Sequence, residues 1–449
     1  MKRICIFLMF VFSVTTGFSN SIEGNTEKEK IEDVKSETET RLETLEFGLD
    51  SEVTSLIKEL VAEEENPDFT KQLAELFNLT KNTALKDVLI NYFTKFVNDS
   101  IKDYALYILE DPYDEKNTTV SALIKYVATL KFEEAGESIV AIIENDEKKY
   151  FNDAVTALGL IGGPDEAQYL VEYLENDVTT GEKQSIIKAI AAIKAIETYD
   201  MLVELVEDDD ENTYVRMYAA EAIGAMKPEE STKILIELFS STDPNLREYA
   251  VKGLTNNPSK DAEKLILNAL KDDYYKVRVQ AIASIKEMKL SEAGASLLYR
   301  SKNDAETVVK NACYDALAYL DYNKGVDYMV ELLGDDKVND SVKTQVAKAF
   351  LEHDNSPGVN AVIDLALKVV KDDKKKTLRY ALGKEFAKYE NSKFDKVCEA
   401  YLASEDVSTK GTGLDIYKTN KFLSLRQTVS QMAEEDKSTI IKSKAKSVL

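Results

Sequence analysis

His353 is the only histidine among the 449 residues, so any chemistry that needs an imidazole must use it. Imidazole-based zinc and iron sites need two or three histidines, and a serine–histidine–aspartate triad needs a histidine held beside a nucleophile. The residues that follow, Asn355-Ser-Pro-Gly358, are typical of a helix end. We therefore interpret His353 as a surface residue at a helix terminus, and we predict no catalytic residue, no metal site and no cofactor.

Three Ser-x-x-Lys pairs could supply the nucleophile and base of a penicillin-binding enzyme: Ser55/Lys58, Ser185/Lys188 and Ser443/Lys446. The companion Ser-Asp-Asn and Lys-Thr-Gly motifs of that chemistry are missing, and a lysine-rich chain produces such pairs by accident. Acidic runs such as Asp208-Asp-Asp-Glu211 and Asp272-Asp273 lack the alternating spacing of a calcium loop. We interpret these runs as helix caps, so the sequence predicts neither acyl transfer nor calcium binding.

The N-terminus is typical of an export signal. Lys2 and Arg3 precede an apolar run, and Gly17-Phe-Ser19 offers small residues for cleavage after Ser19. We predict a signal peptide over residues 1–19, a charged and partly helical leader over 20–48, and an exported, periplasmic protein that is not inserted in the membrane. A signal that stays uncleaved and acts as an anchor is the alternative.

The charge of the mature chain constrains its partners. Removal of Lys2 and Arg3 from the 57 basic residues leaves 55 against 81 acidic residues, a net charge of -26. Such a chain repels nucleic acid and anionic membranes, whereas a basic protein or peptide is favoured electrostatically. We predict a basic protein or peptide partner and no nucleic acid, with solubility alone as the other explanation of the charge.

A repeat of about thirty residues organises the chain. Ala219, Ala250 and Ala281 occupy equivalent positions in three similar segments, at two successive steps of 31 residues. Periods of 20–50 residues are typical of solenoids, in which each unit covers the apolar face of the next. Amphipathic helical patterns alternate with short turns, for example at Gly162-Gly163-Pro164 and Lys227-Pro228. We therefore predict an all-α array of about eleven or twelve two-helix units over residues 49–449, clearest over 117–407.

The repeats resemble a known family. Val215-Arg216-x-x-Ala219, Leu246-Arg247-x-x-Ala250 and Val277-Arg278-x-x-Ala281 are similar to the first-helix signature of short HEAT-like repeats. The resemblance implies a right-handed α-α superhelix and a ladder in which an aspartate caps each helix while the arginine reaches the aspartate of a neighbouring repeat. It assigns these roles to Asp210/Arg216, Asp272/Arg278, Asp304/Lys310 and Asp373/Arg379. Arg247 departs from the pattern because Ser241 stands six residues before it.

The second helices of the units carry one acid between apolar pairs. These acids are Glu172, Glu204, Glu237 and Glu331. Apolar neighbours on both sides push such a position towards solvent. The resemblance places second helices on the concave surface, so we predict a concave acidic stripe that binds the partner, with Tyr173 and Tyr299 as aromatic neighbours. A solvated ridge without a partner is the alternative.

The function that these features favour is a non-enzymatic, exported scaffold for protein–protein interaction. Two HEAT-like enzyme classes fit poorly: phycobilin lyases work on a cytoplasmic chromophore system, and DNA glycosylases present a basic concave face, often with tryptophan, which this chain lacks. Two other hypotheses stay open. One is a structural role in an envelope assembly through repeat stacking, and the other is an enzyme or small-molecule-handling protein with an unrecognised site.

Overall fold

The computed structural model describes residues 36–63, 69–145, 148–255 and 257–449. These residues form helices and turns without any strand. The predicted signal peptide and the first part of the leader lie outside the described residues. Among the helices of the described ranges, none combines the length and apolar character that crossing a membrane requires. The chain divides into two compact units, one up to Val88 and the other from Leu89 onwards.

The N-terminal unit consists of α1 (Glu37–Phe47), α2 (Asp50–Ala62), α3 (Thr70–Leu79) and the start of α4 (Thr83–Lys95). Ser36 begins α1 with a capping box, because its hydroxyl accepts from the Glu39 N–H at 3.2 Å and its own N–H donates to the Glu39 carboxylate at 2.9 Å. In α2 and α3 the buried residues lie on one face of each helix: Val53, Leu56, Ile57, Leu60, Leu73 and Phe77.

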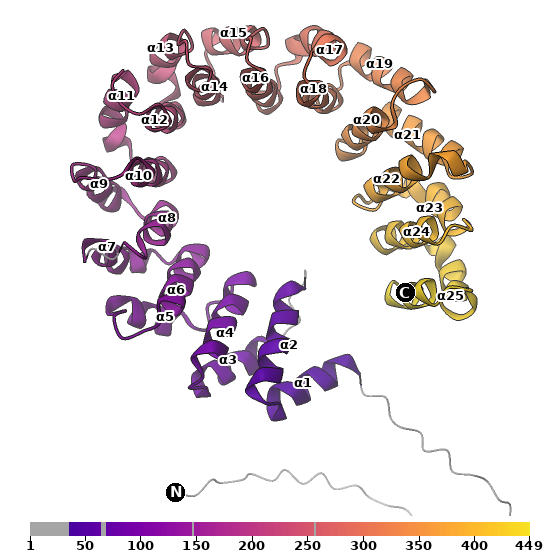
Figure 1. Ribbon diagram of the computed structural model, residues 1–449, viewed down its shortest axis with the longest axis horizontal. Coiled ribbons are helices and arrows are strands. Elements are labelled where there is room, and N and C mark those ends of the chain that lie inside the picture. Colours follow the sequence, from indigo (N-terminus) through magenta and orange to yellow (C-terminus); the bar gives the residue numbers. More distant parts are fainter. Residues whose placement is uncertain (1–35, 64–68, 146–147, 256) are drawn as a thin grey trace, which may run out of the picture. The chain divides into compact units, whose positions relative to one another are not determined.

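The C-terminal unit is a stack of helix pairs (Figure 1). The first helices of the pairs are α6 (Asn117–Leu130), α8 (Phe151–Ile161), α10 (Thr180–Ile193), α12 (Thr213–Met226), α14 (Pro244–Gly253), α16 (Tyr275–Glu287), α18 (Thr307–Tyr319), α20 (Asp340–Glu352), α22 (Lys376–Phe386) and α24 (Val407–Asn420), followed by α26 (Thr439–Ser447). The second helices are α5 (Lys102–Glu110), α7 (Gly136–Glu144), α9 (Pro164–Tyr173), α11 (Tyr199–Glu207), α13 (Pro228–Leu238), α15 (Lys260–Ala269), α17 (Gly294–Asn303), α19 (Asn323–Gly334), α21 (Ser356–Val369), α23 (Asp395–Leu402) and α25 (Arg426–Glu435). Short 3-10 turns lead into six of the helices, at Glu133–Ala135, Ile196–Thr198, Ser291–Ala293, Asp373–Lys375, Ser392–Phe394 and Leu423–Leu425.

Small residues set the spacing of the first helices. Ala219, Ala250 and Ala281, the positions that reveal the repeat, are fully buried. At α12 and α14 the backbones approach so closely that a Cβ on Gly224 would collide with the Gly253 carbonyl. Each first helix therefore packs directly on the next along the C-terminal unit, whereas successive second helices, apart from α19 and α21, touch one another less. The all-α array of stacked helix pairs predicted from the repeat is confirmed.

The prediction that second helices line the concave face is wrong. Figure 1 shows α10, α12, α14, α16 and α18 on the inner side of the curve that the repeats of the C-terminal unit follow, with α9, α11, α13, α15 and α17 outside them. The first helices carry buried alanines and glycines and therefore pack more closely than the second helices. A stack curves towards its more tightly packed row, which places the first helices on the inner side. The acids of the second helices therefore lie on the outer row.

Candidate partner-binding site

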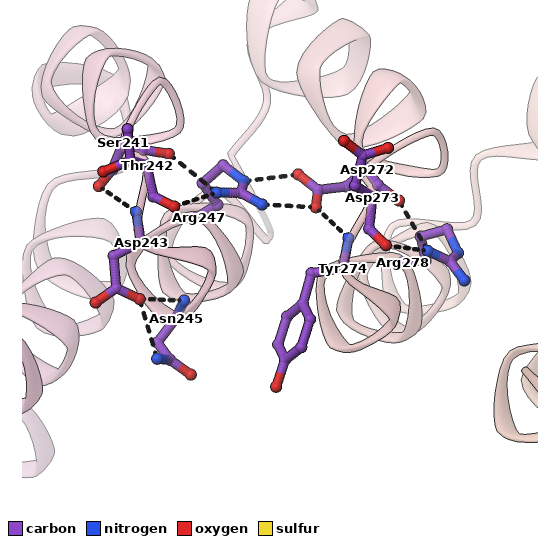
Figure 2. A network of polar contacts seen from close by, with 9 residues as sticks. All are labelled: Ser241, Thr242, Asp243, Asn245, Arg247, Asp272, Asp273, Tyr274 and Arg278. Carbon is purple, nitrogen blue, oxygen red and sulfur yellow. Dashed lines mark hydrogen bonds and ion pairs between the residues drawn. The ribbon is translucent and has the colours of Figure 1, made fainter.

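Arginine–aspartate contacts join neighbouring repeats in the middle of the stack, and Figure 2 shows the one between Arg247 and Asp272. Arg247 on α14 donates to both carboxylate oxygens of Asp272, from Nε at 2.8 Å and from Nη2 at 2.9 Å. The same carboxylate accepts from the Tyr274 N–H at 2.8 Å and so caps the turn before α16. Arg247 Nη1 also donates to the carbonyl oxygens of Ser241 and Thr242 at 3.0 and 3.1 Å. One side chain thus fixes both the turn before its own helix and the following repeat.

Arg278 repeats this arrangement one unit later. It donates to Asp304 from Nε at 2.9 Å and from Nη2 at 2.7 Å, and its Nη1 donates to the carbonyl oxygens of Asp272 and Asp273. Burial alone would raise the pKa of Asp304, but hydrogen bonds from Arg278 and from the Glu306 N–H outweigh it and lower the pKa. The carboxylate is therefore ionised and paired in the folded protein.

The other predicted ladder positions behave differently. Arg216 pairs with Asp209 at 2.8 Å and donates to the Val206 carbonyl, whereas Asp210 contributes only its backbone N–H, donated to Asp208. Asp304 caps the turn before α18 by accepting from the Glu306 N–H at 3.0 Å, the role that the resemblance gives it, and Lys310 is half-buried. Asp373 lies exposed in a 3-10 turn, and Asp372 accepts from the Lys374 N–H there in its place. Arg379 lies 3.7 Å from Asp406 of the following repeat, and its Nε and Nη2 lack hydrogen-bond partners. Arg247, Arg278 and Arg379 each face an aspartate of the following repeat, which is the direction of contact that the resemblance implies.

The four acids of the predicted stripe are all exposed: Glu172 on α9, Glu204 on α11, Glu237 on α13 and Glu331 on α19. They do not form a concave stripe, because their helices stand in the outer row. Glu237 borders a hollow of about 430 Å³ together with Glu207, Asp209 and Arg216. Tyr299 on α17 is 61% exposed, with the Arg300 guanidinium 5.9 Å from its ring centroid.

Glu172 and Tyr173 lie together in a hollow of about 620 Å³ formed by α7, α9 and the start of α10. Its charged lining residues are the acids Glu144, Glu172, Asp177 and Glu182 and one base, Lys148. Glu182 caps α10 by accepting from the Thr179 N–H at 2.7 Å, and Glu172 accepts from the Gln168 amide at 3.0 Å. Four carboxylates against one ammonium give this hollow a strongly negative potential.

Two aromatic residues, Tyr169 and Tyr173, line the same hollow. The Tyr173 ring centroid lies 6.1 Å from that of Tyr169 and 5.5 Å from that of Phe151. The Tyr169 hydroxyl is buried and has no hydrogen-bond partner in the structure. Burial raises the pKa of this hydroxyl, and the charge of Glu144 raises it further, so the phenol keeps its proton. Carboxylates beside tyrosine faces and a free hydroxyl form a suitable environment for a cationic side chain.

A second hollow, which the sequence did not predict, lies on the inner row. It has a volume of about 550 Å³, and its walls include Tyr218 of α12 and Tyr249 of α14, whose rings meet edge to face at 5.5 Å. Lys188 lies 4.1 Å from the Tyr218 ring centroid, and Lys252 pairs with Glu221 at 2.9 Å. The two tyrosines are 31 residues apart, so their recurrence at one repeat position is the signal that could have revealed this surface.

The interpretation of His353 as a surface residue is also wrong. His353 does end α20, as predicted, but its side chain is only 14% exposed. Its Nε2 lies 2.6 Å from Asp315 Oδ1, and the Tyr319 ring meets it edge to face at 5.2 Å. The interpretation missed this environment because Asp315 and Tyr319 belong to α18 of the preceding repeat.

Stacked helix pairs with arginine–aspartate contacts between repeats define a HEAT-repeat solenoid. The model of the family described as spirochaete HEAT repeat protein matches residues 45–448. The chain belongs to this family. No curated protein matches the sequence.

Solved structures resemble the chain at low sequence identity. The complex of CpcE and CpcF of phycocyanin lyase from Nostoc sp. PCC7120 is 15% identical with a TM-score of 0.36, over 58% of this chain and 96% of that one. The karyopherin Kap121p bound to the extreme C-terminus of the protein phosphatase Cdc14p is 12% identical with a TM-score of 0.39. That match covers 93% of this chain and 52% of the karyopherin chain, so this chain spans about half of the karyopherin's length.

Proposed function

We propose that this protein is an exported, non-enzymatic scaffold that binds a basic protein or peptide through the outer-row hollow around Glu172. The observation that carries the proposal is the convergence of four carboxylates and two tyrosines in that hollow. The HEAT-repeat fold supports the scaffold part, because stacked repeats offer extended surfaces for other chains. The net charge of the chain supports a basic partner.

The hollow fits one lysine or arginine side chain of such a partner. Glu144 and Asp177 would pair with the cation, the face of Tyr173 would cover its alkyl chain, and the Tyr169 hydroxyl would donate to a carbonyl of the bound peptide. Cation–aromatic contacts contribute about 0.5–2 kcal/mol, the larger value when the contact is desolvated. Glu204, Glu237 and Glu331 would add long-range attraction from the same outer row rather than direct contacts.

In-cell crosslinking of the tagged full-length protein, followed by mass spectrometry, tests this proposal. The variant Glu172→Lys/Asp177→Lys reverses two charges in the hollow. Asp327→Lys/Glu390→Lys makes the same change in net charge at two exposed positions outside it. We expect a recurrent basic partner with the wild type and the control, and its loss with the hollow variant.

Equal capture of that partner by both variants would contradict the proposed site. Crosslinks between copies of this chain alone would instead favour the structural role in an envelope assembly. Export is tested separately, because a tagged chain that lacks residues 1–19 should stay in the cytoplasm while the full-length chain is found outside it.

A further inference from the structure

A second polar site lies where three inner-row helices meet. Asp315 on α18 accepts a hydrogen bond through Oδ2 from Lys286 Nζ on α16 at 2.6 Å. Its Oδ1 lies 2.6 Å from Nε2 of His353, which follows α20. The exposed Glu352 precedes His353, and one ligand atom from each of Asp315, Glu352 and His353 lies within 4.8 Å of the others. One imidazole nitrogen and two carboxylates thus converge from two neighbouring repeats.

The end of α20 makes this convergence possible. Side chains of consecutive residues in a helix diverge by about 100°. His353 is the C-cap residue, with φ -103° and ψ 9°, and Asp354 has a positive φ of 45°, so the chain leaves the helix at this point. Two contacts fix the turn: Asn391 Nδ2 donates to Asp354 at 2.8 Å, and Asn355 Nδ2 donates to Asp321 at 2.8 Å. Glu352 and His353 are therefore held near Asp315 by the surrounding structure.

The hydrogen bonding of Asp315 suits a metal ligand. Lys286 occupies Oδ2 and orients Oδ1 towards the imidazole, as hydrogen-bonded partners of ligating carboxylates do in metal proteins. A count of histidines leaves out carboxylate oxygens, which also bind zinc, and two carboxylates lie beside His353.

We propose that Asp315, Glu352 and His353 form a mononuclear site for a divalent transition-metal ion of the zinc type. The ion would replace the direct contact between His353 and Asp315 and would keep one position for water, as in sites with three protein ligands. An imidazole nitrogen favours Zn²⁺ over Mg²⁺ and Ca²⁺, which prefer all-oxygen sites. Because the ligands come from α18 and α20, the bound ion would link two adjacent repeats.

Calorimetric titration of the full-length protein, stripped of metal with a chelator, tests the site with ZnCl₂ as the probe. We expect one Zn²⁺ to bind per chain, and affinity at least about tenfold lower in His353→Ala and in Asp315→Asn. Asp327→Asn, which removes an exposed acid of the outer row, should bind like the wild type. MgCl₂ should give no comparable binding, and Co²⁺ should produce visible absorption bands that His353→Ala abolishes.

Absence of Zn²⁺ binding to the wild type would overturn the proposal. The same affinity in His353→Ala and the wild type would overturn it as well, because the ion would then be bound by surface acids. Far-UV circular dichroism of each variant checks that the helices are intact. The result does not depend on the hollow around Glu172, because that hollow is built from α7, α9 and α10.

Discussion

Arg278 and Asp304 join two adjacent repeats through parallel hydrogen bonds of 2.9 and 2.7 Å, and their side chains are 8% and 0% exposed. The pair is 26 residues apart in sequence and buried between α16 and α18. Such a contact resists the sliding of one repeat over the next, because any shift would leave two charges buried without partners.

Arg278→Met should destabilise the middle of the stack by about 3–5 kcal/mol, because it leaves the Asp304 carboxylate buried and uncompensated. Lys368→Met is the matched control, since Lys368 and Asp336 form a pair with 61% and 78% of their side chains exposed. Exposed pairs contribute about 0–1 kcal/mol. Hydrogen exchange of the α16 and α18 amides measures the effect locally, and equal protection in the two variants would contradict the account.

The same pair predicts a dependence on pH. Because the pKa of Asp304 is lowered in the folded protein, its contribution to stability is complete above the unfolded pKa of about 3.9 and is lost as the pH falls through the folded pKa. Asp272 beside Arg247 behaves in the same way. Urea unfolding of the wild type and of Arg278→Met/Asp304→Leu should therefore differ in its dependence on pH below about 4. If the free energy of unfolding changed with pH in the same way for both proteins, the proposed contribution of Asp304 would be refuted.

Gly224→Ala should separate α12 from α14, since its Cβ would collide with the Gly253 carbonyl. We expect a loss of about 1–3 kcal/mol, the usual cost of overpacking a well-packed contact. Gly181→Ala is the control for replacing a helical glycine by alanine without a collision, because no atom lies within 4 Å of a Cβ at that position. The thermal unfolding midpoint should fall for Gly224→Ala and not for Gly181→Ala, and the reverse order would show that the backbones do not meet there.

Tyr169→Phe should weaken peptide binding to the outer-row hollow without lowering the stability of the unbound protein. The Tyr169 hydroxyl is buried without a partner, so its removal should leave the unbound protein equally stable or slightly more stable. A peptide that accepts a hydrogen bond from this hydroxyl should bind about threefold to tenfold more weakly to the variant. Lower thermal stability of the unbound variant would show that the hydroxyl already has a partner.

The sequence predicted the repeat better than it predicted the surfaces. Ala219, Ala250 and Ala281 revealed the period because the tight packing of first helices demands a small residue at that position. The same alanines let the first helices pack closely, so that the first helices form the inner row. A sequence pattern does not show how the spacing of the first helices compares with that of the second helices. The prediction that Glu172 lies on the concave face was therefore wrong.

The side-chain contacts around Glu172 and His353 could not be predicted from the sequence pattern either. Glu144 and Glu182 join Glu172 only because α7, α9 and α10 meet around one hollow. His353 and Asp315 are 38 residues apart, and a sequence spacing longer than the repeat gives no signal of proximity. The tyrosines at positions 218 and 249, in contrast, could have been found by comparing equivalent positions of adjacent repeats.

Titration of a pentalysine peptide into the purified protein tests the central claim most directly. We expect binding that weakens with added salt, falls at least about tenfold in Glu172→Lys/Asp177→Lys, and is retained in Asp327→Lys/Glu390→Lys. The same peptide with acetylated lysines should not bind, because acetylation removes the charge. Equal affinity of the two charge-reversal variants for pentalysine would contradict the claim that the hollow around Glu172 binds a basic partner.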